Sequence, residues 1–463
     1  MNSAQIQAYY RDNKTARLTT LCVMCVGTFL ATFTLSSVLV AIPSIAVTLK
    51  ADAMQVSWIP SIYMLCNVAT TLAIGRLADI WGRKRVYLSG VALLIGASLL
   101  GYVAPTIEWL LFSRGLQGIA GAMIFGCSLA ILTSVYESGG RSSAIGTMAA
   151  AAFTGLTCGP FVGGWLTDDF GWRSVFLFPT PFLVACILTL LWQLKGEWRA
   201  EQELRMDWLG ASLFAAGACL LFISVSIPIS LVTLAGVVLA IIVFREFFKQ
   251  QARAEFPLIR IRRLWANRMF SRSLLANVMM YGATFPLVFL LSLYLQYIQE
   301  MSVTEAGQLI MLQALMTALM SPIAGYWSDR KPTRLVASLG CILVIASLLP
   351  MQGLGFGSSI TMIAIALGLC GLGFGLFGPP NNSAAIGSVS VERLGVASAL
   401  LSMSRVVGNM LGTSVIMLLM SIYIGPEQIE PAQYGALVNV VQIALGVCLL
   451  FTIIGCYFSL SRE

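Results

Sequence analysis

The chain has 463 residues, of which 58% are apolar and only 10% are charged, and its mean hydropathy is +0.86. Soluble globular chains carry about 25% charged residues, so this composition excludes a water-soluble enzyme, and the absence of polar low-complexity tracts excludes a disordered chain. The net charge of +8, from 28 Lys and Arg against 20 Asp and Glu, therefore concerns membrane orientation rather than nucleic acid. The class that remains is a polytopic membrane protein.

Fourteen apolar segments follow one another along the chain. Each approaches or exceeds the length of about 20 residues that a helix needs to cross a hydrocarbon layer of about 30 Å. Their apolar runs are continuous, whereas barrel strands alternate apolar and polar residues, so we predict helices and an all-α fold. The expected spans are 18–48, 55–75, 86–104, 109–134, 143–166, 174–194, 208–228, 230–247, 270–297, 304–327, 335–352, 358–379, 394–422 and 436–459.

Lys and Arg gather in alternate loops, and this asymmetry predicts the orientation of the chain. Of the 28, only Lys50 and Arg173 fall on one side of the bilayer, Arg114 and Arg405 lie within spans, and the remaining 24 fall on the other side. Because cytoplasmic loops carry the excess of positive charge, both termini are expected in the cytoplasm. We expect a multi-pass protein of the cell membrane, either a plasma membrane or a bacterial inner membrane.

An internal repeat predicts how the helices are organised. Gly75 and Asp79 close the second span, and Gly325 and Asp329 close the tenth at the same spacing, 250 residues later. We therefore predict a cytoplasmic tail, a six-helix bundle, linkers with two inserted helices, a second six-helix bundle and a short tail, over residues 1–17, 18–194, 195–269, 270–459 and 460–463. Within the linkers, the basic stretch 260–265 fits either an amphipathic helix on the inner leaflet or an ordinary cytoplasmic linker.

Three motifs, taken in order, resemble those of a known family. They are Gly75-x3-Asp79-x2-Gly82-Arg83-Lys84-Arg85, Arg114-Gly115-Leu116-Gln117-Gly118 and Gly155-x3-Gly159-Pro160-x2-Gly163-Gly164. They resemble signature motifs of the major facilitator superfamily, and fourteen spans with a central inserted pair resemble its drug:proton antiporter branch. The resemblance covers nearly the whole chain and implies a major facilitator fold of two six-helix bundles plus two inserted central helices. It also implies secondary active transport, and the fifth-helix motif is typical of exchange or export.

The loop after the second span places a carboxylate and a guanidinium one helical turn apart, at Asp79 and Arg83, on either side of Gly82. A carboxylate at the cytoplasmic mouth can pair with an arginine or with an exposed helix N-terminus. We interpret these residues, together with Asp329 in the second half, as a latch on the inner gate. The alternative is a solvated loop that anchors the topology.

Gly155, Gly159 and Gly163 recur every four residues, which places them on one face of the fifth helix. Glycine lets another helix approach closely, and Pro160 between them weakens and can bend the helix. We predict a tight, pivoting contact that seals one end of the pathway, with generic membrane-helix packing as the alternative.

Two arginines lie inside predicted spans, Arg114 in the fourth and Arg405 in the thirteenth. An arginine that faces lipid at mid-depth costs about 2.5–3.5 kcal/mol on insertion scales, so both should face the protein interior, water or a partner. We predict that they line the substrate pathway together with Gln117, with capping of backbone carbonyls as the alternative for Arg405. Other polar candidates, each of which could instead join helices by hydrogen bonds, are Thr34, Asn67, Asn277, Tyr281, Gln313, Asn381 and Asn409.

The sequence departs from the family pattern in its acidic residues. Many proton-coupled members of this branch carry an aspartate in the first helix, near the sequence that is Ala31 to Thr34 here. No Asp or Glu lies well inside a predicted span, and the chain has no His. A proton carrier inside the membrane is normally one of these side chains, so the sequence argues against coupling through a central carboxylate. A cavity with two arginines and no fixed negative charge disfavours organic cations and accepts neutral or anionic amphiphiles.

These observations predict a secondary active transporter that exports small amphipathic organic compounds by alternating access, driven by the proton-motive force. The alternative is an organic-anion or metabolite carrier, a uniporter or symporter, without a central proton-carrying carboxylate. A membrane-embedded enzyme or sensor is a remote third hypothesis, because the spans offer no His and no carboxylate pair. The expected partners are the small-molecule substrate, the lipid bilayer and protons. We expect no cofactor, metal or nucleic acid, and a monomer is plausible.

Overall fold

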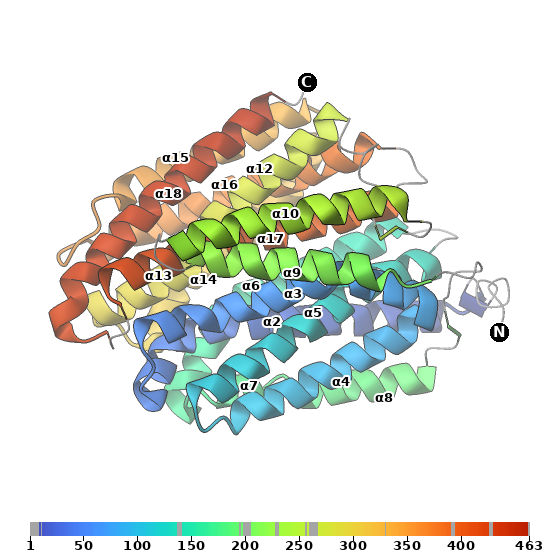
Figure 1. Ribbon diagram of the computed structural model, residues 1–463, viewed down its shortest axis with the longest axis horizontal. Helices are drawn as coiled ribbons and strands as arrows, with labels where there is room; N and C mark the ends of the chain where they lie inside the picture. Colours follow the sequence, from blue (N-terminus) through green and yellow to red (C-terminus); the bar gives the residue numbers. More distant parts are fainter. Residues whose placement is uncertain are drawn as a thin grey trace.

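The computed structural model shows a chain that is helical throughout its described residues, apart from short connections (Figure 1). The described residues are 9–10, 12–136, 141–193, 196–197, 205–226, 231–254, 257–258, 267–328, 330–389, 394–425 and 429–461. Asp329 and the basic stretch 260–265 lie outside these ranges, so what we expect of them stays a prediction.

The helices coincide with the fourteen predicted apolar segments. The first half contains α2 (Lys14–Leu49), α3 (Ala53–Trp81), α4 (Arg83–Tyr102), α5 (Ile107–Val135), α6 (Arg141–Phe170), and α7 (Ser174–Leu177) with α8 (Thr180–Gln193) as one interrupted span. The inserted pair is α9 (Trp208–Ser226) and α10 (Leu231–Arg253). The second half contains α12 (Arg268–Thr284), α13 (Pro286–Leu293) and the π-helix η1 (Tyr294–Ile298) as one span, then α14 (Val303–Ser328), α15 (Thr333–Met351), α16 (Ile360–Gly387), α17 (Leu394–Tyr423), the 3-10 helix η3 (Pro431–Gln433) and α18 (Tyr434–Leu460).

Length and hydropathy identify this chain as a multi-pass membrane protein. Twelve of the described helices or helix runs are long and apolar enough to cross a membrane. The apolar helix α9 is shorter, and α6, at 30 residues, completes the set of fourteen. Twelve of the fourteen predicted spans therefore meet this criterion, and the helices follow one another in the predicted order.

Local sequence signals explain several helix boundaries. At the start of α3, the Asp52 carboxylate accepts a hydrogen bond from the Gln55 backbone N–H at 2.7 Å. The Gln55 side chain in turn accepts one from the Asp52 N–H at 3.1 Å, which completes a capping box. Gly82 separates α3 from α4 with a φ of +111°, a backbone conformation that glycine adopts readily. Pro286 begins α13, a position where the missing N–H leaves little unsatisfied.

Two seams join the halves of the molecule. Figure 1 shows most first-half helices (blue to teal) below and most second-half helices (yellow to red) above, with α9 and α10 crossing the front between them. One seam is formed by α6 against α14, and the other by α3 against α17. The helix α9 packs on both α3 and α17, so the inserted pair lies over the second seam.

The contact between α9 and this second seam is aromatic on one side and rich in methionine on the other. Phe214 and Phe222 of α9 pack in one buried cluster with Met64 of α3 and with Met410 and Met417 of α17. The side chains are nearly inaccessible to solvent, so the inserted helices are part of the protein core at this seam rather than a peripheral addition.

The predicted repeat is visible as matched contacts in the two halves. The Asn67 side-chain N–H donates to the Gly118 carbonyl at 3.0 Å, which joins α3 to α5. The Thr317 hydroxyl donates to the Gly371 carbonyl, also at 3.0 Å, which joins α14 to α16. The donors lie 250 residues apart and the acceptors 253 residues apart, so the repeated sequence pattern builds the same helix pair twice.

Candidate functional site

A cavity lies between the two halves, bounded by α2 and α6 on one side and by α12, α13, α14 and α16 on the other. It holds about 670 Å³ of space not filled by atoms, openings included. Its lining consists of Ser36, Leu39, Phe153, Leu156, Thr157, Pro160, Tyr281, Thr284, Phe285, Val288, Ile310, Gln313, Ala314, Thr317 and Phe374.

The cavity lining is largely apolar and aromatic, with a few hydroxyl groups and one amide. The rings of Tyr281 and Phe374 meet edge to face, with centroids 4.9 Å apart. The Gln313 side chain is only 8% exposed, and its carbonyl oxygen has no hydrogen-bond partner. Of the described residues around the cavity, none carries a charge. The surroundings therefore suit a molecule with an apolar body and a few hydrogen-bonding groups.

Of the ten residues predicted to form the substrate pathway, the structure places Tyr281 and Gln313 in the cavity wall. Pro160, predicted as part of the sealing helix, lines the cavity as well. The aromatic residues Phe153 and Phe374 were missed, because their sequence surroundings do not distinguish them from the many other phenylalanines of the spans.

Arg114 is fully buried within the first half and does not line the cavity. Its guanidinium donates to the backbone carbonyls of Ile59 and Thr34, each at 3.3 Å, and to the Gln117 side chain at 2.7 Å. It also lies over the Tyr63 ring, 4.9 Å from the centroid. Arg114 faces the protein interior as its burial cost requires, but its observed contacts cap carbonyls of α2 and α3, the role that we had weighed for Arg405.

Arg405 is half-buried and does not itself line the cavity. Its guanidinium interacts with the hydroxyl of Tyr281, which is part of the cavity wall. On the other side it lies 6.0 Å from the centroid of the Phe125 ring, on α5 of the first half. Arg405 therefore brings a positive charge next to the cavity and contacts both halves.

The predicted polar residues on inner faces mostly join helices. The Asn277 side chain donates to the Leu401 carbonyl at 3.3 Å and to the Ser404 hydroxyl at 2.9 Å. Asn381 donates to the Ser273 carbonyl at 3.1 Å. The Thr34 hydroxyl is satisfied within its own helix, and Asn409 is buried with its side-chain oxygen unpaired. The side-chain oxygens of Asn277 and Asn381 are also unpaired, but the donor groups of these two residues and the Thr34 hydroxyl bond to helices rather than facing an open surface.

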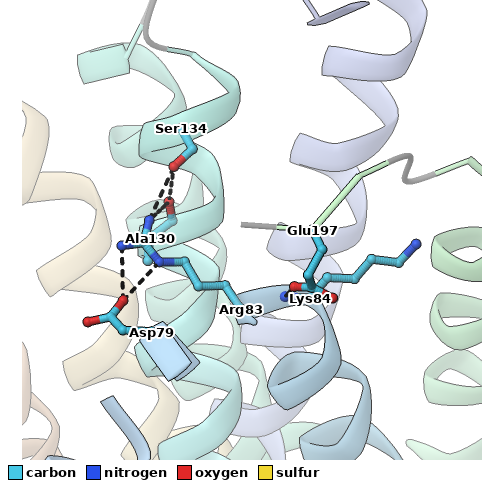
Figure 2. A network of polar contacts seen from close by, with 6 residues as sticks. All are labelled: Asp79, Arg83, Lys84, Ala130, Ser134 and Glu197. Carbon is cyan, nitrogen blue, oxygen red and sulfur yellow. Dashed lines mark hydrogen bonds and ion pairs between the residues drawn. The ribbon is translucent and has the colours of Figure 1, made fainter. Parts of the chain in front are cut away.

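The loop between α3 and α4 is held by a compact polar network (Figure 2). The Asp79 carboxylate pairs with the Arg83 guanidinium at 3.1 Å. Arg83 also donates to the Ser134 hydroxyl at 3.2 Å, at the end of α5. Within the described part of the chain, Asp79 pairs with Arg83 alone. In this conformation the two residues of the predicted latch therefore contact each other and other first-half residues, not the second half.

A residue that the sequence did not single out completes this network. The Glu197 carboxylate accepts a hydrogen bond from the Lys84 backbone N–H at 2.9 Å and lies 3.7 Å from the Arg85 guanidinium. A Cβ atom at Gly82 would lie 2.4 Å from the Glu197 carboxyl carbon, so the glycine makes room for this contact. Glu197 was missed because it lies 113 residues from its partner in a linker of mixed charge.

The glycine face of α6 packs against α2 within the first half. A Cβ atom at Gly155 would lie 2.3 Å from the Phe29 carbonyl oxygen, and one at Gly163 would lie 2.6 Å from that of Ser37. At Gly159 it would overlap the Ser36 hydroxyl. The close approach predicted from the spacing is present and joins α6 to α2 within the first half, and the sealing role stays a prediction.

A neighbouring edge of α6 makes the contact between the halves. A Cβ atom at Gly164 would lie 2.8 Å from the Val303 carbonyl oxygen of α14, and one at Gly307 would lie 2.4 Å from the Pro160 carbonyl oxygen. The two backbones therefore touch directly. Gly307 was missed, because a single glycine in an apolar run carries no signal.

The described residues contain no group of three His, Cys, Asp or Glu side chains that could hold a metal ion. Helices that cross a membrane and enclose a cavity between two similar halves define a membrane transporter. The sequence pattern of the Major Facilitator Superfamily matches residues 24–413, and the chain belongs to this family.

Curated relatives match most of the chain at moderate identity. The riboflavin transporter RibZ of Clostridioides difficile (strain 630) is 27% identical over 398 residues, which are 85% of this chain and 86% of the relative. The multidrug resistance protein Stp of Mycobacterium tuberculosis (strain CDC 1551 / Oshkosh) is 28% identical and is matched over 86% of this chain and 75% of Stp. The tetracenomycin C resistance and export protein of Streptomyces glaucescens is 26% identical, over 88% of this chain and 76% of the relative.

The fold is shared with a solved transporter. The crystal structure of a bacterial homolog of the human lysosomal transporter Spinster, in an inward-facing and unoccupied conformation, superposes with a TM-score of 0.70. The match covers 97% of each chain at 17% sequence identity. At this identity the comparison establishes the fold alone.

Proposed function

We propose that this transporter exports small amphipathic organic compounds, neutral or anionic, by alternating access, and that the proton-motive force drives the export. The observation that carries the proposal is the cavity, to which both halves contribute and whose described lining is aromatic, aliphatic and uncharged. An organic cation would lose its hydration there without gaining a carboxylate partner, which is costly. A neutral molecule with hydrogen-bonding groups meets hydroxyls and the Gln313 amide.

The names of the relatives support this substrate class. Two of them are named for multidrug resistance and for tetracenomycin C resistance and export, and a third for riboflavin transport. Riboflavin is an uncharged molecule with a planar aromatic ring system and a polar chain. The edge-to-face pair of Tyr281 and Phe374 offers a surface on which such a ring system can pack.

The contact between α6 and α14 supports alternating access, in which the substrate pathway is closed at one end of the molecule at a time. It lies near the C-terminal end of α6, which the distribution of Lys and Arg assigns to the outer side. A transporter that is closed there would load substrate from the cytoplasm and release it after the halves rock apart at this end. With both termini in the cytoplasm, this direction corresponds to export.

A second candidate is an organic-anion or metabolite carrier without proton coupling. The observation that favours it is Arg405, whose guanidinium reaches Tyr281 in the cavity wall. No acidic residue offsets that charge among the described residues that line the cavity. A positive charge close to a low-dielectric cavity attracts anions.

Transport by reconstituted protein separates these candidates. Liposomes would be loaded with riboflavin as the neutral probe, an anionic fluorescent dye or a cationic one, with and without an imposed pH gradient. We expect flux of the neutral and anionic probes that depends on the gradient and collapses with a proton ionophore. Anion flux that ignores the ionophore would favour the carrier. Fast cation flux with strong pH dependence, and none of the neutral probe, would refute the proposed substrate class.

A further inference from the structure

The outer end of the α6–α14 seam carries a polar contact that the sequence did not predict. The Asp168 carboxylate, near the C-terminal end of α6, accepts a hydrogen bond from the Thr304 backbone N–H at 2.8 Å. The same carboxylate oxygen accepts a second, short hydrogen bond from the Thr304 hydroxyl. Thr304 is the second residue of α14, so a carboxylate from the first half lies on a helix N-terminus of the second half.

The chemistry of this contact favours the ionised carboxylate. The first N–H groups of a helix have no partner within the helix, and the helix dipole makes this end partly positive. Hydrogen bonds to an ionised acceptor are shorter and stronger than neutral ones. The first turn of α14 is partly satisfied by itself, since the Glu305 carboxylate accepts a hydrogen bond from the Ser302 N–H at 2.9 Å. The Thr304 N–H is thereby left for Asp168.

The backbone geometry shows that the contact depends on the closed seam. Gly164, one helical turn before Asp168, lies against the Val303 carbonyl without room for a Cβ atom. Gly307, one turn further into α14, lies against Pro160 in the same way. The Asp168 carboxylate reaches Thr304 only while these backbones touch, so separating the halves at this end must break both hydrogen bonds.

The neighbouring residue provides an internal comparison. Asp169 is exposed like Asp168, but no hydrogen bond or ion pair involves it in the described structure. The inner loop provides another, because Asp79 pairs with Arg83 inside the first half. Of these three carboxylates, Asp168 is the one whose observed hydrogen bonds cross between the halves.

We infer that Asp168 is a positioning residue of the outer gate, whose carboxylate holds the N-terminus of α14 and stabilises the outward-closed state. The gating role of Asp168 in this inference rests on the proposed alternating-access function. Loss of the carboxylate shifts the population toward the outward-open state. The transporter then spends less time loading substrate from the cytoplasm, so its apparent KM for cytoplasmic substrate rises.

Hydrogen–deuterium exchange in lipid nanodiscs tests the gate without any substrate. In Asp168→Ala, the amides of the first turn of α14 should exchange at least about tenfold faster than in the wild type, as the loss of two charge-assisted hydrogen bonds implies. In Asp169→Ala, the matched control, they should exchange as in the wild type. Equal exchange in the two variants would overturn the inference. If Asp168→Ala does not insert, Asp168→Asn keeps the shape and loses the charge, and its exchange should still exceed that of Asp169→Asn.

A double-mutant cycle tests whether Asp168 acts through Thr304. Thr304→Val removes the hydroxyl donor and should speed exchange in the first turn of α14 by itself, but add little in the Asp168→Ala background. Fully additive effects would contradict a direct contact. Because the exchange measurements need no transport, a failure of the proposed substrate class leaves this test intact. If exchange changes as expected while the KM for an established substrate does not, the contact is structural and the gating role is refuted.

Discussion

Arg114 shows how one side chain can stabilise a bundle through backbone acceptors. Its guanidinium serves the buried carbonyls of Ile59 and Thr34 and the Gln117 side chain. A hydrogen bond from a charged donor contributes about 1.5–3 kcal/mol. We therefore predict that Arg114→Ala lowers the thermal unfolding temperature in detergent by several degrees, as followed by intrinsic fluorescence. Arg114→Lys should restore only part of the loss, because lysine lacks the planar fork of donors. An unchanged unfolding temperature with abolished transport would instead place Arg114 in the transport mechanism.

Arg405 is predicted to act on selectivity rather than on stability. Its positive charge lies beside the cavity, next to Tyr281, and the charge is only half-buried. Arg405→Gln should reduce the flux of an anionic dye by about tenfold relative to a neutral one, because a favourable charge–charge term is lost in a low-dielectric site. Arg405→Lys, which keeps the charge, serves as the control. An equal loss for both dyes in Arg405→Gln would mean that Arg405 does not select by charge.

The role of a residue could be predicted from the sequence only where its immediate neighbours along the chain indicate that role. The polar and aromatic character of Tyr281 and Gln313 within apolar helices was enough to nominate both for the cavity. Glu197 and Asp168 could not be nominated, since their partners lie 113 and 136 residues away along the chain. A carboxylate at the end of a helix looks the same in sequence whether it faces water or the N-terminus of another helix.

At the scale of the helix, α6 uses adjacent faces for different neighbours. The Gly155 face packs on α2, and the edge with Gly164 packs on α14. The period of four predicted that one face would be tightly packed, but it does not say which helix fills it. The interruptions of the sixth and ninth spans, at the α7–α8 junction and at Pro286, also went unpredicted, because continuous hydrophobicity hides a local change of helix geometry.

A pair of glycine substitutions tests the close packing of α6. Gly155→Ala would place a Cβ atom 2.3 Å from the Phe29 carbonyl oxygen, whereas Gly126→Ala in α5 meets nothing within 4 Å. We predict that Gly155→Ala destabilises the protein by about 1–3 kcal/mol through overpacking. Gly126→Ala should be neutral or stabilise by up to about 1 kcal/mol, because alanine is the better helix former. Thermal unfolding of both variants measures this, and a similar change in the two would contradict the packing geometry.

At the scale of the whole molecule, the orientation rests on the distribution of charge. Only Lys50 and Arg173 lie on the predicted outer side. We predict that epitope tags at the N-terminus and at the C-terminus are both hidden from antibody in intact cells and become accessible after permeabilisation. A tag inserted between α15 and α16, at the predicted outer loop near Gly355, should label without permeabilisation. The opposite pattern would invert the topology and turn the proposed direction of transport around.

The seam between α3 and α17, beneath α9, has a further consequence for how the molecule moves. Met64, Met410 and Met417 are three of the buried residues of α3 and α17 in the cluster that α9 packs against. Unbranched thioether chains refill a gap after a displacement more readily than branched side chains do. In the alternating access that we propose, these methionines would let the inserted helices keep van der Waals contact with both bundles as the bundles change position. Oxidation would stiffen this surface, because methionine sulfoxide is polar and packs poorly in such a place.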